Sequence, residues 1–116
     1  MSILFADGNA SLLKTMSLIM SHKGFDVTTA EDGIEAVEKA RESHFDVIIL
    51  DIRMPRMDGV EAYRRIKHIR PGAVVMMMTA YALDDLIQDA FNEGAQEVFY
   101  KPLDIDEVIT SIKAMG

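Results

Sequence analysis

Four polar residues stand where they could do chemistry together, provided that the chain folds so as to bring them to one place. They are two carboxylates, a hydroxyl and an ammonium: Asp7, Asp51, Thr79 and Lys101. Each comes directly after a short apolar stretch of the kind that forms a strand. A carboxylate nucleophile near a second carboxylate, a hydroxyl and a cation fits phosphoryl transfer, in which a protein mainly positions groups and neutralises charge. Taken singly, each is an ordinary loop or surface residue, so the inference rests on their convergence.

The segment Asp46–Gly59 determines how Asp51 is presented. Val47–Leu50 is a continuous aliphatic run, as a strand buried on both faces requires. Pro55 and Gly59 then impose turns and fix how the chain enters the next helix. We therefore expect Asp51 to lie exposed and reactive in a loop of set geometry.

Apolar strand-like segments alternate along the chain with segments that have the periodicity of amphipathic helices. The strand-like segments are Ile3–Ala6, Phe25–Thr29, Val47–Leu50, Val74–Met78 and Val98–Tyr100. The helical segments carry their apolar positions between Leu12 and Met20, Ile34 and Ala40, Val60 and Ile66, Leu83 and Phe91, and Ile105 and Ile112. Strict alternation with right-handed crossovers predicts an α/β fold, a doubly wound five-stranded parallel sheet with five helices on its two faces. Functional groups then gather at the carboxyl ends of the strands.

The ends of several helices are marked in the sequence. Gly24, Gly72 and Gly94 follow helical segments and are expected to be C-terminal caps. Asp104 is expected to cap the last helix, with Glu107 completing a capping box. The remaining acidic residues before and within the last two helices, Asp84 among them, are interpreted as solvated helix faces.

Composition limits the class of protein. With 116 residues and 49% hydrophobic content, one compact domain over residues 1–116 is expected. The absence of cysteine excludes disulfides and thiolate metal sites and permits a reducing compartment, so cytoplasm is the expected location. No apolar run approaches the roughly 20 residues that span a bilayer, and no secretion signal is recognisable. The net charge of −7 disfavours direct binding of nucleic acid.

Several segments resemble, in order and spacing, the receiver domain of two-component response regulators over essentially the whole chain. They are Ile3–Asp7, Asp46–Gly59, Met78–Ala80, Gly94–Ala95 and Lys101–Pro102. The resemblance implies the flavodoxin-like strand order 2-1-3-4-5 and a cis peptide bond before Pro102. It also implies a signalling module and not an enzyme with an external substrate. Phosphorylation from a donor and self-dephosphorylation are the only turnover expected.

The resemblance assigns a role to each candidate residue. Asp51 would accept a phosphoryl group from a histidine kinase or a phosphotransfer protein, with Thr79 hydrogen-bonded to that group and Lys101 paired with it. Mg²⁺ would be held by Asp7, Asp51 and the backbone carbonyl of Arg53. The altered surface would act on a downstream partner or on an output domain, and a homodimer through the last two helices and the fifth strand is a further possibility. Neither nucleic acid nor a membrane is an expected partner.

Two positions depart from the family pattern. Gly8 stands where the family usually has a second acidic metal ligand beside Asp7, so weakened binding of Mg²⁺ is expected, unless water or Asn9 fills the gap. Val98 stands where receivers commonly have an aromatic switch residue. Strand alternation points Phe99 to the opposite face, so the switch is expected to use the loop that contains Tyr81. Tyr81 and Arg53 would also flank the phosphoryl group and shield it from water.

Two alternative functions remain open at this stage. A pseudo-receiver that binds a partner without being phosphorylated is favoured by Gly8 and Val98 and would bind no Mg²⁺. A flavodoxin-like redox carrier has the same topology, but the turn Ala6–Ala10 lacks the hydroxyl-rich loop that binds the phosphate of a flavin nucleotide. A colourless protein would exclude the redox carrier.

Overall fold

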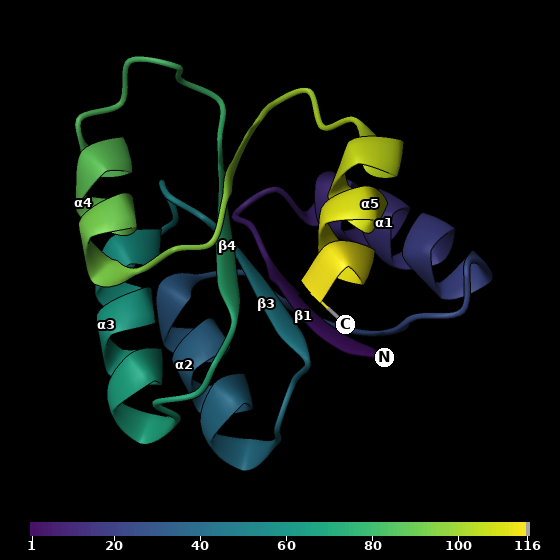
Figure 1. The fold of residues 1–116 in the computed structure, drawn as a ribbon, viewed down its shortest axis with the longest axis horizontal. Helices are drawn as coiled ribbons and strands as arrows, with labels where there is room; N and C mark the ends of the chain where they lie inside the picture. Colours follow the sequence, from purple (N-terminus) through teal and green to yellow (C-terminus); the bar gives the residue numbers. More distant parts are fainter. Residues whose placement is uncertain (116) are drawn as a thin grey trace.

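The computed structural model describes residues 1–115 and consists of one sheet covered by helices on both faces (Figure 1). The elements in chain order are β1 (Ser2–Ala6), α1 (Ala10–His22), β2 (Asp26–Ala30), α2 (Gly33–Glu42), β3 (Val47–Asp51), α3 (Gly59–Ile69), β4 (Val75–Thr79), α4 (Leu86–Glu93), β5 (Val98–Tyr100) and α5 (Ile105–Met115). All strand pairs are parallel and the order is β2-β1-β3-β4-β5. The predicted doubly wound fold, the five strands and the strand order are confirmed.

Strand alternation divides the core into two layers, one on each side of the sheet. Leu4, Ile48 and Met77 pack in the layer under α2, α3 and α4, whereas their neighbours along the strands pack under α1 and α5. Every residue of β3 and of β4 is buried, which explains why these two strands are almost entirely apolar. Val98 and Phe99 contact opposite layers, as predicted.

The helix ends agree with the sequence except after α3. Gly24 and Gly94 have the left-handed backbone that favours glycine, with φ of 96° and 107°. Gly72 does not have it, because α3 already ends at Ile69 with Arg70 as its cap, so the prediction of a glycine cap there was wrong.

The start of α5 carries only part of the predicted cap. Asp104 accepts the N–H of Glu107 at 3.2 Å. The reciprocal bond of a capping box is absent from residues 1–115, so Asp104 alone caps this helix.

A membrane-spanning helix is not found among residues 1–115, because none of the helices there combines the necessary length with an apolar sequence.

Helix α4 begins later than the apolar pattern predicts. Leu83 was expected within the helix, but it lies in the preceding loop with 99% of its surface exposed, and α4 starts at Leu86. The cause is Asp84, whose carboxylate accepts the N–H of Leu86 at 2.9 Å and thereby fixes the first residue of the helix. The segment 80–85 therefore forms a loop at the carboxyl end of β4.

Candidate functional site

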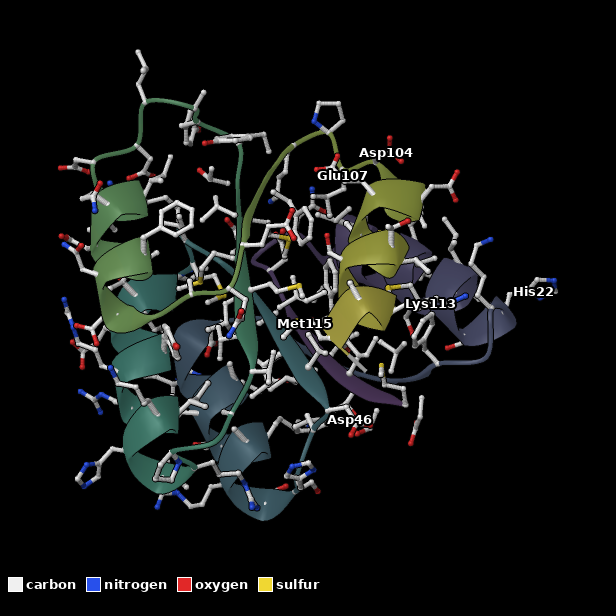
Figure 2. The ribbon with its side chains drawn as sticks, in the orientation of Figure 1. His22, Asp46, Asp104, Glu107, Lys113 and Met115 are labelled. Atoms are coloured by element: carbon white, nitrogen blue, oxygen red, sulfur yellow. The ribbon has the colours of Figure 1, made fainter. Side chains whose placement is uncertain are left out.

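The four candidate residues lie at the carboxyl ends of four strands. Asp51 and Thr79 are the last residues of β3 and β4, and Asp7 and Lys101 directly follow β1 and β5. Figure 2 shows this edge of the molecule near the labelled Asp104 at the start of α5, with Asp46, just before β3, toward the opposite edge. Parallel strands place these ends together because all of them run in the same direction.

Lys101 holds the two carboxylates together. Its Nζ donates to Oδ2 of Asp7 at 2.5 Å and to Oδ2 of Asp51 at 3.0 Å. The Asp7 and Asp51 side chains are almost fully buried, whereas 20% of the Lys101 side chain is exposed. The convergence of these three residues, predicted from their positions after strands, is therefore observed. The peptide bond between Lys101 and Pro102 is cis, as predicted.

Asp51 itself is placed differently from the sequence expectation. It was predicted to be an exposed loop residue, but it pairs with Met78 as the last residue of β3 and is buried. Its Oδ1 is also near the N–H of Arg53, at 3.4 Å. The carboxylate of Asp51 is thus contacted from two sides, by the N–H of Arg53 and by Nζ of Lys101.

The site has two carboxylates and one cation, and the pKa values reflect this imbalance. Burial raises the pKa of Asp51, and the charge of Asp7 raises it further, while Lys101 opposes both effects. Burial disfavours the charged form of Lys101, yet hydrogen bonds to the two carboxylates raise its pKa above the ordinary value. The Asp7–Asp51–Lys101 cluster, when fully ionised, keeps one unit of excess negative charge, which favours binding of a further cation.

Thr79 reaches the same edge but is bonded elsewhere. It is fully buried, and its Oγ1 accepts the N–H of Tyr81 at 3.1 Å. The backbone carbonyl of Thr79 accepts the N–H of Lys101 at 2.8 Å. Tyr81 is 65% exposed and does not cover Asp51 in this form, so its predicted shielding of a phosphoryl group stays a prediction.

Gly8 leaves the site without a third carboxylate. Among residues 1–115 no group of three or more His, Asp or Glu side chains is arranged to hold a metal. Asn9 does not replace the missing ligand, because its Oδ1 caps α1 by accepting the N–H groups of Ser11 and Leu12 at 3.0 and 3.2 Å. A Cβ atom at Gly8 would lie 2.9 Å from Cδ of Pro55, so the space for a side chain is narrow.

Sequence reasoning missed one part of this region, the ion pair between Arg53 and Asp84. Nε and Nη2 of Arg53 donate to the two oxygens of Asp84 at 2.9 and 2.8 Å, and Nη2 also donates to Asp85 at 2.9 Å. The Asp84 side chain is only 2% exposed, so its interpretation as a solvated helix residue was wrong. No periodicity relates residues that are 31 positions apart, and therefore no local signal could have found the pair.

Comparison with known proteins agrees with this geometry. The family model described as the response regulator receiver domain matches residues 3–113. The chain is 38% identical over 106 residues to the transcriptional regulatory protein ZraR of Klebsiella oxytoca, which covers 91% of the chain but 24% of that regulator. It is 36% identical over 111 residues to the chemotaxis protein CheY of Bacillus subtilis, covering 95% of the chain and 92% of CheY.

A solved structure shows the same fold. The receiver domain of the sensor histidine kinase PA1611 from Pseudomonas aeruginosa, which has a magnesium ion coordinated in its active site cleft, matches with a TM-score of 0.90 and 26% identity. The match covers 98% of this chain and 95% of the other. From its strand order, its cluster of Asp7, Asp51 and Lys101, and the family match, the chain belongs to the receiver domain family of response regulators.

Proposed function

We propose that this domain accepts a phosphoryl group on Asp51 from a histidine kinase or a phosphotransfer protein and signals by the resulting change in its surface. The observation that carries the proposal is the buried carboxylate of Asp51, bound to Lys101 and facing the same ammonium as Asp7. A buried carboxylate held in one orientation beside a cation suits attack on phosphorus, because little reorganisation remains when charge develops.

The reaction balances with the groups in the site. A carboxylate oxygen of Asp51 forms a bond to phosphorus while the bond from phosphorus to the donor's leaving atom breaks, and the leaving group departs with its electron pair. Lys101 then exchanges its bond to Asp51 for one to the phosphoryl oxygens. Thr79 can donate its hydroxyl to the same group only after it turns away from Tyr81, which the loop 80–85 must permit.

The residues present fit Mg²⁺ as the additional cation. Asp7, Asp51 and the backbone carbonyl of Arg53 supply hard oxygen ligands, and Mg²⁺ usually keeps several waters and takes only one or two protein carboxylates. The bound ion would neutralise charge on the transferring phosphoryl group. Because Gly8 contributes no ligand, we expect weaker binding of Mg²⁺ than at a site with a third carboxylate.

The proposed partners follow from the same role. A histidine kinase or phosphotransfer protein supplies the phosphoryl group in the cytoplasm, and a downstream protein or an output domain responds to it. The face formed by α4, β5 and α5 presents Phe91 and Tyr100, both about half exposed, and could also join two copies of the chain. The domain turns over no external substrate in this proposal.

Intact mass after incubation with acetyl phosphate and Mg²⁺ tests the proposal. We expect one acid-labile phosphoryl adduct on the wild-type chain and none on Asp51→Asn. Asp26→Asn is the matched control, since Asp26 is an exposed aspartate at the start of β2, and it should be labelled like the wild type. An unlabelled wild-type chain, or a labelled Asp51→Asn, would overturn the assignment.

One observation favours a second candidate, a pseudo-receiver that binds its partner without phosphorylation. Gly8 removes a metal ligand, and Asn9 is committed to capping α1. This candidate predicts no adduct at any Mg²⁺ concentration, so the same mass measurement separates the two.

A further inference from the structure

A closed ring of contacts joins Asp51 to the loop before α4. Its members, in order, are Asp51, Arg53, Asp84, Tyr81, Thr79 and Lys101. The ring begins and ends on the Asp51 carboxylate, whose Oδ1 is contacted by the N–H of Arg53 and whose Oδ2 accepts Nζ of Lys101. A change at the carboxylate therefore has two routes to the loop 80–85.

The links around that loop are two backbone–backbone bonds and one bond from a backbone N–H to a side-chain hydroxyl. The N–H of Asp84 donates to the carbonyl of Tyr81 at 3.1 Å, and the N–H of Tyr81 donates to Oγ1 of Thr79 at 3.1 Å. The carbonyl of Thr79 in turn accepts the N–H of Lys101 at 2.8 Å. Two links of the ring join side chains of segments that are far apart in the sequence, Lys101 with Asp51 and Arg53 with Asp84.

This pair is built as a clamp. Two parallel bonds between a guanidinium and a carboxylate fix both position and orientation, which a single bond does not. The Asp84 side chain is nearly inaccessible to solvent and also accepts the N–H of Leu86, so a further hydrogen bond holds its carboxylate at the start of α4.

We infer that Asp84 is a positioning residue for the metal site: by clamping the Arg53 side chain it holds the Arg53 backbone carbonyl in the orientation that a divalent cation needs. The inference rests on the proposed function, in which that carbonyl is a ligand. The site offers only two carboxylates, so it depends strongly on its one carbonyl. A residue that orients a ligand changes metal affinity by about 10- to 100-fold.

The clamp also gives metal binding a consequence at a distance. If the ion fixes the Arg53 peptide, the guanidinium stays on Asp84 and the loop before α4 becomes more rigid. Linkage requires the reverse as well, so a partner that pulls this loop away from Arg53 lowers the affinity for the metal by the same factor.

The test is a Mg²⁺ titration of the ¹⁵N-labelled domain followed in two-dimensional ¹H–¹⁵N NMR spectra. In the wild type, we expect the amide signals of Arg53 and of residues 81–86 to shift with one common Kd. Asp84→Asn, which keeps an acceptor for Leu86 N–H but removes the ionic clamp, should raise that Kd about tenfold.

Two controls separate positioning from simple electrostatics. Asp85→Asn removes the same negative charge from the same loop, but the Asp85 side chain is 89% exposed and makes no hydrogen bond to the start of α4, so the Kd for Mg²⁺ should change less than about twofold. Arg53→Gln removes a positive charge near the metal, which on electrostatic grounds alone tightens binding of a cation. The clamp predicts weaker binding instead.

The outcomes distinguish this inference from the proposed function. Equal Kd values for the wild type, Asp84→Asn and Asp85→Asn, or tighter binding by Arg53→Gln, overturn the clamp while phosphorylation of Asp51 can still be observed by mass. Phosphorylation that fails in a chain whose Kd depends on Asp84 overturns the proposed function and leaves the clamp standing. A wild type that binds no Mg²⁺ overturns the clamp outright. The dispersion of the NMR signals reports whether each variant is folded.

Discussion

Two carboxylate–cation clusters lie at the same edge of the sheet, and they are built in opposite ways. In the cluster of Asp7, Asp51 and Lys101, two buried carboxylates share one ammonium, and burial raises the pKa of Asp51. In the clamp, the guanidinium of Arg53 donates two hydrogen bonds to the carboxylate of Asp84 and lowers its pKa. In both clusters two carboxylates share one cation, but in the clamp the second carboxylate, that of Asp85, is 89% exposed and its charge is screened by solvent, whereas Asp7 and Asp51 are both buried.

This difference corresponds to the roles that we propose, with the cluster of Asp7, Asp51 and Lys101 as the reactive site and the pair of Arg53 and Asp84 as its support. A buried charge deficit costs stability and attracts a cation, which suits the phosphoryl transfer that we propose for Asp51. The bidentate pair of Arg53 and Asp84 fixes both position and orientation, and the further bond from Arg53 to Asp85 goes to an exposed side chain. The buried cluster around Asp51 and the ion pair of Arg53 are neighbours, because Asp51 and Arg53 are two residues apart along the chain.

The largest expected effect comes from removing the shared cation. Lys101→Met leaves Asp7 and Asp51 buried and facing each other, and we expect the free energy of unfolding to fall by about 3 kcal/mol. Arg53→Met should cost less, because the Arg53 side chain is half exposed and Asp84 keeps the N–H of Leu86. Urea denaturation measures both.

Millimolar Mg²⁺ sharpens this comparison. It should restore part of the stability lost in Lys101→Met, since the ion can replace the ammonium, and it should do less for Arg53→Met. If Arg53→Met is the more destabilised of the two, the contrast drawn between the clusters is wrong.

Adding the missing carboxylate increases the charge deficit. Gly8→Asp should tighten the Kd for Mg²⁺ about thirtyfold, because a carboxylate about 4 Å from a divalent ion gains about 2 kcal/mol even in water. Without metal the same variant should be less stable than the wild type. Isothermal titration calorimetry and thermal unfolding give the two quantities.

Gly8→Asn is the matched control for that variant. It makes the same close approach of Cβ to Pro55 without the charge. Equal Mg²⁺ affinity of the Asp and Asn variants would show that space at Pro55, and not charge, governs this position.

The pH dependence of stability should have opposite signs in the two clusters. The folded pKa of Asp51 is raised, so ionising Asp51 costs the folded state stability once the pH exceeds the unfolded pKa. Asp51→Asn should therefore gain about 1 kcal/mol at pH 7, and the gain should vanish as the pH falls below about 4.

Asp84 should behave in the reverse way. Its folded pKa is lowered, so its contribution is present above the unfolded pKa and is lost as the pH falls through the folded value. Asp84→Asn should be destabilised at pH 7 and approach the wild type in acid. Thermal unfolding between pH 7 and pH 3 checks both variants. A loss of stability in Asp51→Asn at neutral pH would contradict the conclusion that the cluster of Asp7, Asp51 and Lys101 is short of positive charge.

The smallest effect is expected at Asp85, the second aspartate that is bonded to Arg53. Asp85→Asn should change the free energy of unfolding by less than about 0.5 kcal/mol, because the Asp85 side chain is 89% exposed and its pairing with Arg53 is screened. A loss above about 1 kcal/mol in urea denaturation would mean that the bond of Arg53 to Asp85 stabilises the protein as much as its bonds to Asp84.

Much of the architecture was predictable because it depends on local patterns. The predicted strands agree with the observed ones to within one residue at each end, since apolar runs and turn residues define them. Placing Asp7, Asp51 and Lys101 together needed only the rule that parallel strands end at one edge. Helix α4 was mispredicted at its start because Asp84, and not apolar periodicity, fixes its first residue.

By itself, the sequence predicted the alternation of strands and helices, the placement of Asp7, Asp51, Thr79 and Lys101 after strands and, through its resemblance to receiver domains, the strand order 2-1-3-4-5. Only the tertiary structure decided that Asp51 is buried, that the side chain of Asn9 caps α1, and that Arg53 forms an ion pair with Asp84. The physical reason is range. Periodicity and capping act within a few residues, whereas an ion pair between two loops exists only where the packed sheet brings those loops within about 3 Å of each other.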